Sequence, residues 1–269
     1  MKLLDGKELA GFIKERQAKD VRRLRAVKIF PKLAIVQVKD DPVINTYVRL
    51  KKRYGADIGI EVEQYTPNQA DVPKLLKKLN VDKTVNGIIV QLPLSDASQT
   101  DKIVNMVAPQ KDVDALGKKA KFDPATPMAI LWWLSGYNIE LKGKHILLIG
   151  RGKLVGEPLE KILKASGYDV EVIGREVKSV ARHTKDADII ITATGSPAVL
   201  YPDMIKQGAA VVDAGVASEE GKTVGDLSPE VYKRDDLTVT PQKGGVGPLT
   251  VCALFENVIR AAEQYRASK

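Results

Sequence analysis

A lysine shares one face of a predicted helix with apolar side chains, in the stretch NTYVRLKKRYGADIGI. At helical spacings of three and four residues, the companions of Lys51 on this face are Ile44, Tyr47, Val48 and Tyr54. The lysine can bury its stem and keep its ammonium group in water. Alternatively, burial lowers its pKa and makes it suitable for proton transfer. The helix alone leaves both interpretations open.

Few other residues in the chain are suited to acid–base or metal chemistry. The 269 residues include one cysteine, Cys252, and two histidines, His145 and His183. One cysteine excludes a disulfide within the chain and a cysteine-rich metal site. Neither histidine has a catalytic or ligand partner nearby in sequence. We therefore expect no metal site, and expect Lys, Tyr, Asp or Glu to carry any proton transfer.

Composition and charge narrow the class of protein. Apolar residues make up 44% of the chain, which is enough for a sizeable core. The net charge of +8 is compatible with nucleic acid or with small anionic substrates. The basic residues are spread along the chain without an arginine-rich tail, so we expect no nucleic-acid partner. Because no apolar run is long enough to span a membrane and no signal peptide is present, we expect a cytoplasmic protein.

Apolar strands alternate with helices along the whole chain. The runs KLAIVQV and VNGIIVQLPL indicate buried strands, and helices are expected at 72–79 and 101–107. The polar stretch KKAKFDPATP marks a domain boundary near Pro124. A second alternation follows, through KHILLIG, YDVEVIG, ADIIITATG and GAAVVDAG. This order predicts an α/β fold of two domains, each with a parallel sheet covered by helices.

The stretch KHILLIGRGKLVGEPLEKIL reads as a strand, a glycine-rich turn and a helix. Its glycines Gly150, Gly152 and Gly156 form a variant of the dinucleotide fingerprint. Glycines allow the backbone to approach a pyrophosphate, and the helix N-terminus presents N–H groups to it. The position at a strand–helix junction favours a dinucleotide site over a purely structural turn.

The next strand ends in VEVIGRE, where NAD-dependent enzymes commonly carry a ribose-binding acid. Here Gly174 and Arg175 follow the strand, and Arg151 in the glycine turn adds a second cation. Arginine can accommodate the 2′-phosphate of NADP. Glu176 leaves NAD possible, because it would be the acid if the strand ended one residue later.

Several motifs occur in the order and spacing of one known family. They are YVRLK, GIIVQLPL, KDVD, PATP, GRGKLVGEP, GAAVVDAG, GDL and TPQKGGVGPLT. In these, the chain resembles the methylenetetrahydrofolate dehydrogenase/cyclohydrolase family over nearly its whole length. VQLPL and GGVGPLT together are highly specific. The resemblance implies oxidation of methylenetetrahydrofolate with NADP and hydrolysis of the methenyl product to formyltetrahydrofolate.

The resemblance also implies an architecture. A folate-binding catalytic domain would cover residues 1–123, and the C-terminal helix at 250–269 would pack back on it. A Rossmann-type NADP domain would cover residues 124–249, with the folate cleft between the two domains. The family usually forms homodimers.

The family pattern assigns roles to particular residues here. Lys51 would be catalytic, with Tyr47 beside it against the folate, Gln91 holding the lysine and Asp114 binding the pterin. Further substrate contacts are implied at Val48, Val90, Leu92, Lys243, Gly244, Gly245, Val246, Gly247 and Pro248. Cofactor contacts are implied at Gly150, Arg151, Gly152, Val155, Gly156, Arg175, Thr194, Gly195 and Val216.

Six residues at four places depart from the family pattern. Ala115 and Leu116 replace the usual Gly-Phe after the second aspartate, and Gly152 replaces a serine of the glycine turn. Gly174 and Arg175 replace a His-Ser pair, and Lys243 replaces a proline. These changes affect the pterin loop, the cofactor site and the rim of the cleft, but they leave the residues assigned to chemistry in place.

Two other functions fit parts of the sequence. A shikimate or amino-acid dehydrogenase relative, with another small substrate, would explain the glycine turn but not VQLPL with GGVGPLT. A folate-binding or nucleic-acid-binding module without activity would agree with the basic charge. The joint presence of Tyr47, Lys51, Gln91 and Asp114 argues against such a module.

The two arginines lead to a test of cofactor choice. A guanidinium can bind the 2′-phosphate of NADP⁺ through paired, charge-assisted hydrogen bonds. Arg175→Ala should therefore raise the KM for NADP⁺ and leave the KM for NAD⁺ nearly unchanged in steady-state kinetics. An ordinary surface ion pair with Glu176 would contribute little, so equal changes for both cofactors would remove Arg175 from phosphate binding.

Overall fold

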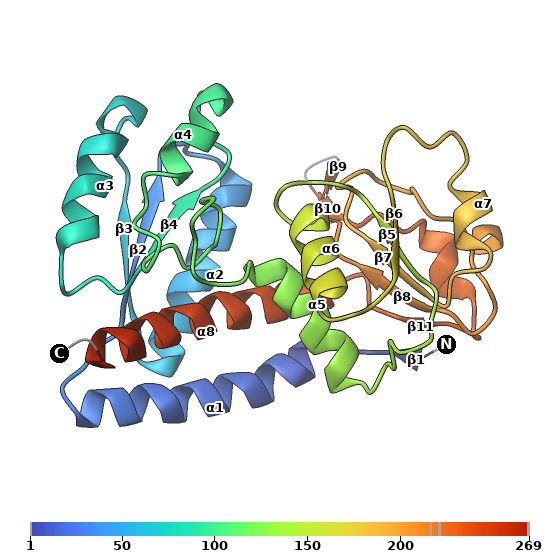
Figure 1. The fold of residues 1–269 in the computed structure, drawn as a ribbon, viewed down its shortest axis with the longest axis horizontal. Helices are drawn as coiled ribbons and strands as arrows, with labels where there is room; N and C mark the ends of the chain where they lie inside the picture. Colours follow the sequence, from blue (N-terminus) through green and yellow to red (C-terminus); the bar gives the residue numbers. More distant parts are fainter. Residues whose placement is uncertain (1, 216, 220–221, 268–269) are drawn as a thin grey trace. The chain divides into compact units, whose positions relative to one another are not determined.

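The computed structural model describes residues 2–215, 217–219 and 222–267. The chain divides into two compact units, each built around one parallel sheet (Figure 1). We call Gly11–Ala125 with Val251–Lys269 the three-stranded unit. We call Met1–Ala10 with Thr126–Thr250 the six-stranded unit.

The sheet of the three-stranded unit has β2 (Lys32–Gln37) at its centre. β3 (Glu61–Tyr65) and β4 (Gly87–Gln91) pair with its two edges, and both pairings are parallel. β2 and β4 are continuous apolar runs that are buried almost throughout. Such runs are typical of parallel strands covered on both faces.

Helices cover both faces of this sheet. On one face, α3 (Val72–Val81) and α4 (Thr100–Val104) form a core with side chains of β2 and β4, including Ala34, Val36, Ile88 and Val90. On the other face, Gly87 of β4 lies so close to Val258 of α8 (Val246–Ala267) that an added Cβ would be 3.2 Å from it. Two short 3₁₀ helices, Gln69–Asp71 and Ala97–Gln99, precede α3 and α4.

A polar network joins three long helices of this unit. In α1 (Gly6–Ala26), the guanidinium of Arg16 donates to both carboxylate oxygens of Glu256 in α8, at 3.2 and 2.8 Å. Gln17 donates to the carbonyl of Cys252 at 2.8 Å and accepts from the hydroxyl of Tyr54 at 2.7 Å. Tyr54 belongs to α2 (Pro42–Ile58), so α2 is tied to α1 and α8.

The sheet of the six-stranded unit is parallel at every pairing. Its strand order is β1 (Lys2–Leu3), β11 (Thr238–Val239), β8 (Ala210–Asp213), β7 (Ile189–Thr192), β5 (Ile146–Ile149) and β6 (Val170–Ile173). The chain leaves β5 toward β6 on one side and then crosses to β7 on the other. The crevice between β5 and β7 is therefore a topological switch point, where open α/β sheets bind ligands.

The other elements of this unit are α6 (Gly156–Ala165), α7 (Ala181–Thr184) and most of α5 (Ala125–Gly136). Strands β9 (Ala217–Glu219) and β10 (Lys222–Val224) form a separate antiparallel pair. Two 3₁₀ helices span Pro202–Met204 and Pro229–Lys233. The indole of Trp133 is fully buried and donates to the carbonyl of Leu4 at 3.0 Å, which fixes the chain after β1.

The structure differs from the sequence expectations at three places. Residues 2–10 were expected in the first domain, but they lie in the six-stranded unit because β1 pairs with β11. The last helix was expected from residue 250 but begins at Val246. The helix expected after β6 is only the single turn α7, Ala181–Thr184.

Candidate functional site

The helix that carries Lys51 has a defined beginning and end. The carboxylate of Asp41 accepts from the N–H groups of Val43 and Ile44, at 2.9 and 3.2 Å, and Pro42 occupies the first turn. Gly59 ends the helix in the left-handed conformation, with φ of 84°. These caps fix the register of α2 and hence the position of Lys51 along it.

Lys51 donates a hydrogen bond from Nζ to Oε1 of Gln91, at 2.8 Å. Gln91 is the last residue of β4 and pairs in register with Gln37 of β2. Its amide nitrogen donates to the carbonyl of Leu92 at 3.2 Å, which turns the amide oxygen toward the lysine. The lysine is therefore held at the carboxyl end of β4, the strand that pairs with the central strand β2.

Burial and charge act in opposite directions on this lysine. Burial lowers the pKa of the Lys51 ammonium, and the charge of Asp114 partly offsets that shift. Burial likewise raises the pKa of the Asp114 carboxyl, and the charge of Lys51 opposes it. Two ionisable groups thus influence each other at the carboxyl end of the sheet. Both pKa values are shifted toward the neutral range, that of Lys51 from above and that of Asp114 from below.

The two aspartates of KDVD have different surroundings. Asp112 is buried, and its carboxylate accepts from the N–H groups of Gly117 and Leu116, at 2.7 and 3.4 Å. Burial raises the pKa of Asp112 to about 6, and these N–H groups oppose the rise. Asp112 therefore builds the loop, as expected for a turn-forming aspartate, and Asp114 is the one whose charge acts on Lys51.

The loop after Asp114 contains one of the departures from the family pattern. Ala115 has φ of 56°, in the left-handed region where glycine is favoured and alanine is strained. A glycine, the residue usual there in the resembling family, would adopt this conformation without that strain. Alanine therefore keeps the loop shape at a conformational cost on the order of 1 kcal/mol.

The remaining residues expected at the substrate differ in accessibility. Tyr47 lies one turn before Lys51 and is 36% exposed, so its ring is available to a ligand. Val48 and Val90 are buried, with 2% and 3% of their surfaces exposed. Both side chains contribute to the core, and substrate contact at these two residues stays a prediction. Leu92 is half-buried and precedes a cis peptide bond to Pro93.

The expected glycine segment at 243–248 lies in the six-stranded unit. Gly244 has φ of 85°, and Gly245 approaches Gly6 so closely that a Cβ on Gly6 would be 1.9 Å from its carbonyl oxygen. Lys243 and Gly247 are exposed, whereas Gly245 and Val246 are buried. Val246, Gly247 and Pro248 form the first turn of α8, where helix N–H groups can face a ligand.

The turn between β5 and α6 has the geometry of a phosphate-binding turn. Gly150 has φ of 119°, and a Cβ on Gly156 would be 1.9 Å from the carbonyl oxygen of Gly150. Only glycine allows this close passage of two backbone segments. Around Gly152, a Cβ would meet nothing within 4 Å, so the space above the turn is open. The ten-residue helix α6 begins at Gly156 and directs its N-terminus to this turn.

Arg151 connects this turn to the end of β6. Its guanidinium donates to the carbonyl of Val172 and, at 3.3 Å, to the carboxylate of Glu176. Glu176 in turn accepts from the N–H of Gly174 at 3.0 Å. Arg175 is exposed. The two arginines expected to bind a 2′-phosphate thus lie beside the same turn, and Glu176 is engaged by Arg151.

Thr194 and Gly195 follow β7, the strand next to β5 in the sheet. Gly195 is left-handed, with φ of 65°. The N–H of Thr194 donates to the carboxylate of Asp226 at 2.7 Å. Val155 precedes α6 and is half-buried. Val216, also expected at the cofactor, lies outside the described residues.

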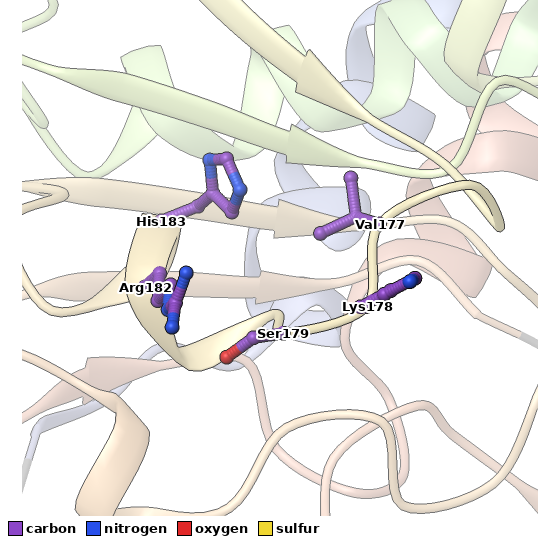
Figure 2. Close-up of a pocket in the computed structure, with 5 residues that line it drawn as sticks. All are labelled: Val177, Lys178, Ser179, Arg182 and His183. Atoms are coloured by element: carbon purple, nitrogen blue, oxygen red, sulfur yellow. The ribbon is translucent and has the colours of Figure 1, made fainter.

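A pocket that the sequence did not predict lies beyond β6 (Figure 2). Its volume is about 380 Å³, and it is lined by Val177, Lys178, Ser179, Arg182 and His183. His183 contacts one carboxylate oxygen of Glu171, and His145 contacts the other at 2.9 Å. The two histidines, which have no partners nearby in sequence, thus meet at one carboxylate.

Neither a metal centre nor a membrane span is found within the ranges that the structure describes. In that part of the chain, no group of three or more His, Cys, Asp or Glu residues could hold a metal ion. No helix among the same residues is long and apolar enough to cross a membrane.

Comparison with protein-family models gives two matches that together cover most of the chain. Residues 4–114 match the catalytic domain of tetrahydrofolate dehydrogenase/cyclohydrolase. Residues 124–266 match the NAD(P)-binding domain of the same family.

Individual relatives agree with these matches. The bifunctional protein FolD of Nautilia profundicola is 36% identical, covering 98% of this chain and 98% of the relative. The crystal structure of the bifunctional FolD dehydrogenase/cyclohydrolase of Campylobacter jejuni is 36% identical, with a TM-score of 0.92 over 98% of this chain and 99% of that one. The Trypanosoma brucei enzyme, solved with NADP and an inhibitor, is 27% identical, with a TM-score of 0.90 over 97% of each chain.

Proposed function

We propose that this chain, which belongs to the tetrahydrofolate dehydrogenase/cyclohydrolase family, carries out the chemistry of that family with Lys51 as its central residue. The protein is a bifunctional, NADP-dependent methylenetetrahydrofolate dehydrogenase and methenyltetrahydrofolate cyclohydrolase. It oxidises methylenetetrahydrofolate to methenyltetrahydrofolate and hydrolyses that product to formyltetrahydrofolate. The observation that carries the residue assignment is the 2.8 Å hydrogen bond from Lys51 to Gln91.

The first reaction requires orientation more than proton transfer. Bound in the six-stranded unit, NADP⁺ would supply the acceptor for the hydride that leaves the methylene bridge of the folate. We assign Tyr47 to this step as a side chain that lies against the folate, because it is accessible and one helical turn from Lys51. The amide of Gln91 keeps the lysine in place while the substrate is bound.

The second reaction requires proton transfers as water adds to the methenyl carbon. A lysine with an ordinary pKa near 10.4 is a poor base at neutral pH. Burial lowers the pKa of Lys51, which increases the fraction that is neutral. Methenyltetrahydrofolate is cationic, and its charge beside the ammonium would act in the same direction. We propose that neutral Lys51 takes the proton from the attacking water.

Asp114 is proposed to bind the pterin ring. Its carboxylate can accept hydrogen bonds from the donor edge of a pterin, and such charge-assisted bonds are strong. The charge of Asp114 also acts on Lys51, so folate bound at Asp114 would be held close to the proposed base. Asp112 is excluded from this role because its carboxylate is occupied by loop N–H groups.

The cofactor is assigned to the six-stranded unit. The open glycine turn at Gly150–Gly156, followed by the N-terminus of α6, suits a pyrophosphate. Arg151 and Arg175 are proposed to bind the 2′-phosphate, and Thr194, Gly195 and Val155 to contact the rest of the dinucleotide. Substrate contacts at 243–248 stay a prediction of the family resemblance, and Lys243 and Gly247 of this segment are exposed. A homodimer remains a prediction of the family resemblance, and a cytoplasmic location remains a prediction from the sequence alone.

Replacement of Lys51 tests the proposed base. Lys51→Gln keeps a similar length but cannot take up a proton, so the cyclohydrolase rate should fall by roughly 100-fold or more. The wild-type rate, corrected for spontaneous hydrolysis, should rise with pH as Lys51 loses its proton, and this rise should disappear in the variant. Methenyltetrahydrofolate absorbance measures both.

Lys52→Gln is the matched control for this variant, because Lys52 is the next residue of α2 and is exposed. It should retain hydrolysis near the wild-type rate. Near-normal hydrolysis by a folded Lys51→Gln protein would exclude Lys51 from the mechanism.

Replacement of Asp114 tests the proposed pterin contact. Asp114→Ala leaves pterin donors without a partner, which costs roughly 1–3 kcal/mol and corresponds to about 5- to 150-fold in kcat/KM. Both activities should fall together, because both use the same folate position. Asp71→Ala, at an exposed aspartate of the same unit, is the control. Loss of only one activity would contradict the assignment.

A further inference from the structure

Two glycine-containing turns border the switch point of the six-stranded sheet. One follows β5 and contains Gly150, and the other follows β7 and contains Gly195. Successive backbone N–H groups in such turns form concave sites that attract anions. Either turn could therefore bind the phosphates of a dinucleotide, and a structural difference between the two turns must determine which one does.

The turn after β7 already has an anion. The carboxylate of Asp226 accepts from the N–H of Thr194 at 2.7 Å through Oδ2, and from the N–H of Ser196 at 3.1 Å through Oδ1. Asp226 is fully buried. Its carbonyl accepts from the N–H groups of Val199 and Leu200, at 2.7 and 3.3 Å. One residue thus organises the backbone from 194 to 200.

A second carboxylate holds Asp226 in place. Asp213, the last residue of β8, accepts through Oδ1 from the N–H groups of Gly215 and Asp226, at 3.0 and 3.1 Å. Its Oδ2 accepts from the N–H of Leu227 at 3.2 Å, and the hydroxyl of Thr192 donates to Oδ1 at 3.3 Å. Asp213 therefore joins the ends of β7 and β8 to the segment that carries Asp226.

Two glycines make room for these carboxylates. A Cβ on Gly215 would be 1.9 Å from Oδ1 of Asp226, and a Cβ on Gly225 would be 2.0 Å from Oδ2 of Asp213. Any larger residue at either position would have to displace one of these two carboxylates. The motifs VVDAG and GDL, which lie 13 residues apart at their aspartates, thus form one interlocked structure.

Burial disfavours the charged form of both carboxyl groups, and hydrogen bonds from backbone N–H groups favour it. Burial raises the pKa of Asp226 and of Asp213, and the N–H donors to each carboxylate act in the other direction. Buried charges of this kind persist only when hydrogen-bonded. The N–H groups of the turn after β7 are consequently needed by Asp226 and are not offered to a ligand.

We propose that Asp226 is a positioning residue of the cofactor half of the site. Its carboxylate fills the anion-binding turn after β7, fixes residues 194–196 beside the switch point, and leaves phosphate binding to the turn after β5. Asp213 supports it by anchoring its backbone to the sheet edge. This inference rests on the proposed function for its NADP component, and on the hydrogen bonds of residues 194–227 for its structural component.

The test removes the carboxylate and then replaces it with a small anion. The variants are Asp226→Ala, Asp226→Asn and, as a control, Asp203→Ala at an exposed aspartate of the same unit. Hydrogen–deuterium exchange of residues 193–200 without nucleotide reports on the turn. Calorimetric titration with NADP⁺ reports on the cofactor site. Each measurement is made with sodium formate and with sodium chloride at equal ionic strength.

For Asp226→Ala we expect faster exchange at 193–200 and NADP⁺ binding weaker by about tenfold. Formate, but not chloride, should reverse both changes because it refills the turn with a carboxylate. Asp226→Asn should show a smaller effect in the same direction, since one oxygen acceptor remains. Asp203→Ala should match the wild type.

Unchanged exchange and NADP⁺ affinity in Asp226→Ala would overturn the proposal, as would equal effects of formate and chloride. If Asp226→Ala fails to fold, wild-type exchange and affinity in Asp226→Asn would overturn it as well. Failure of the wild type to bind NADP⁺ would instead contradict the proposed function, while the exchange measurements would still test the turn.

Discussion

The hydrogen bond between Lys51 and Gln91 is the interaction on which the proposed chemistry depends. A buried lysine needs an acceptor for its N–H groups, and a carboxylate in that place would stabilise the ammonium and keep the pKa high. An amide oxygen fixes Nζ without adding a charge. The opposite charge of Asp114 only partly offsets the effect of burial on the pKa of Lys51. The partner of Lys51 therefore allows the lysine to be both ordered and able to lose its proton.

The six-stranded unit has its candidate site at the same kind of position as the three-stranded unit. In each sheet, the side chains or turns to which we assign a function lie at the carboxyl ends of two adjacent strands, β2 and β4 in one and β5 and β7 in the other. This follows from the way parallel strands and crossover helices leave a crevice at a change of direction. In the six-stranded unit, one turn is kept open by glycine, and its neighbour is filled by the carboxylate of Asp226. The turn after β5 is thus open to an anion, whereas the turn after β7 is occupied by a carboxylate of the protein itself.

Much of this arrangement could be predicted from the sequence because its signals are local. The apolar runs of β2, β4 and β5 and the glycine turn at Gly150–Gly156 identify strands and a strand–helix junction without knowledge of the fold. The motif in α2 identified Lys51, and a motif in β4 identified Gln91. The family resemblance implied that Gln91 holds Lys51, and the structure joins these two residues, which are 40 apart in sequence, by a hydrogen bond.

Other features depend on contacts between distant segments and gave no local signal. β1 is two residues long, and only its pairing with β11 assigns the N-terminus to the six-stranded unit. Val48 lies on the same helical face as Lys51 but is buried, since a shared face does not specify depth. The backbone N–H groups that donate to the carboxylate of Asp226 belong to residues 30 and 32 positions earlier in the chain.

NMR titration of lysine labelled with ¹³C at Cε measures the pKa of Lys51 directly. It therefore tests whether Lys51 can lose its proton and act as the base. The Lys51 signal would be identified by its absence in Lys51→Gln. We expect a midpoint below the ordinary value of about 10.4, and a higher midpoint when Gln91→Glu places a carboxylate at the lysine. A midpoint at or above that ordinary value in the wild-type protein would contradict the proposal that Lys51 acts as the base.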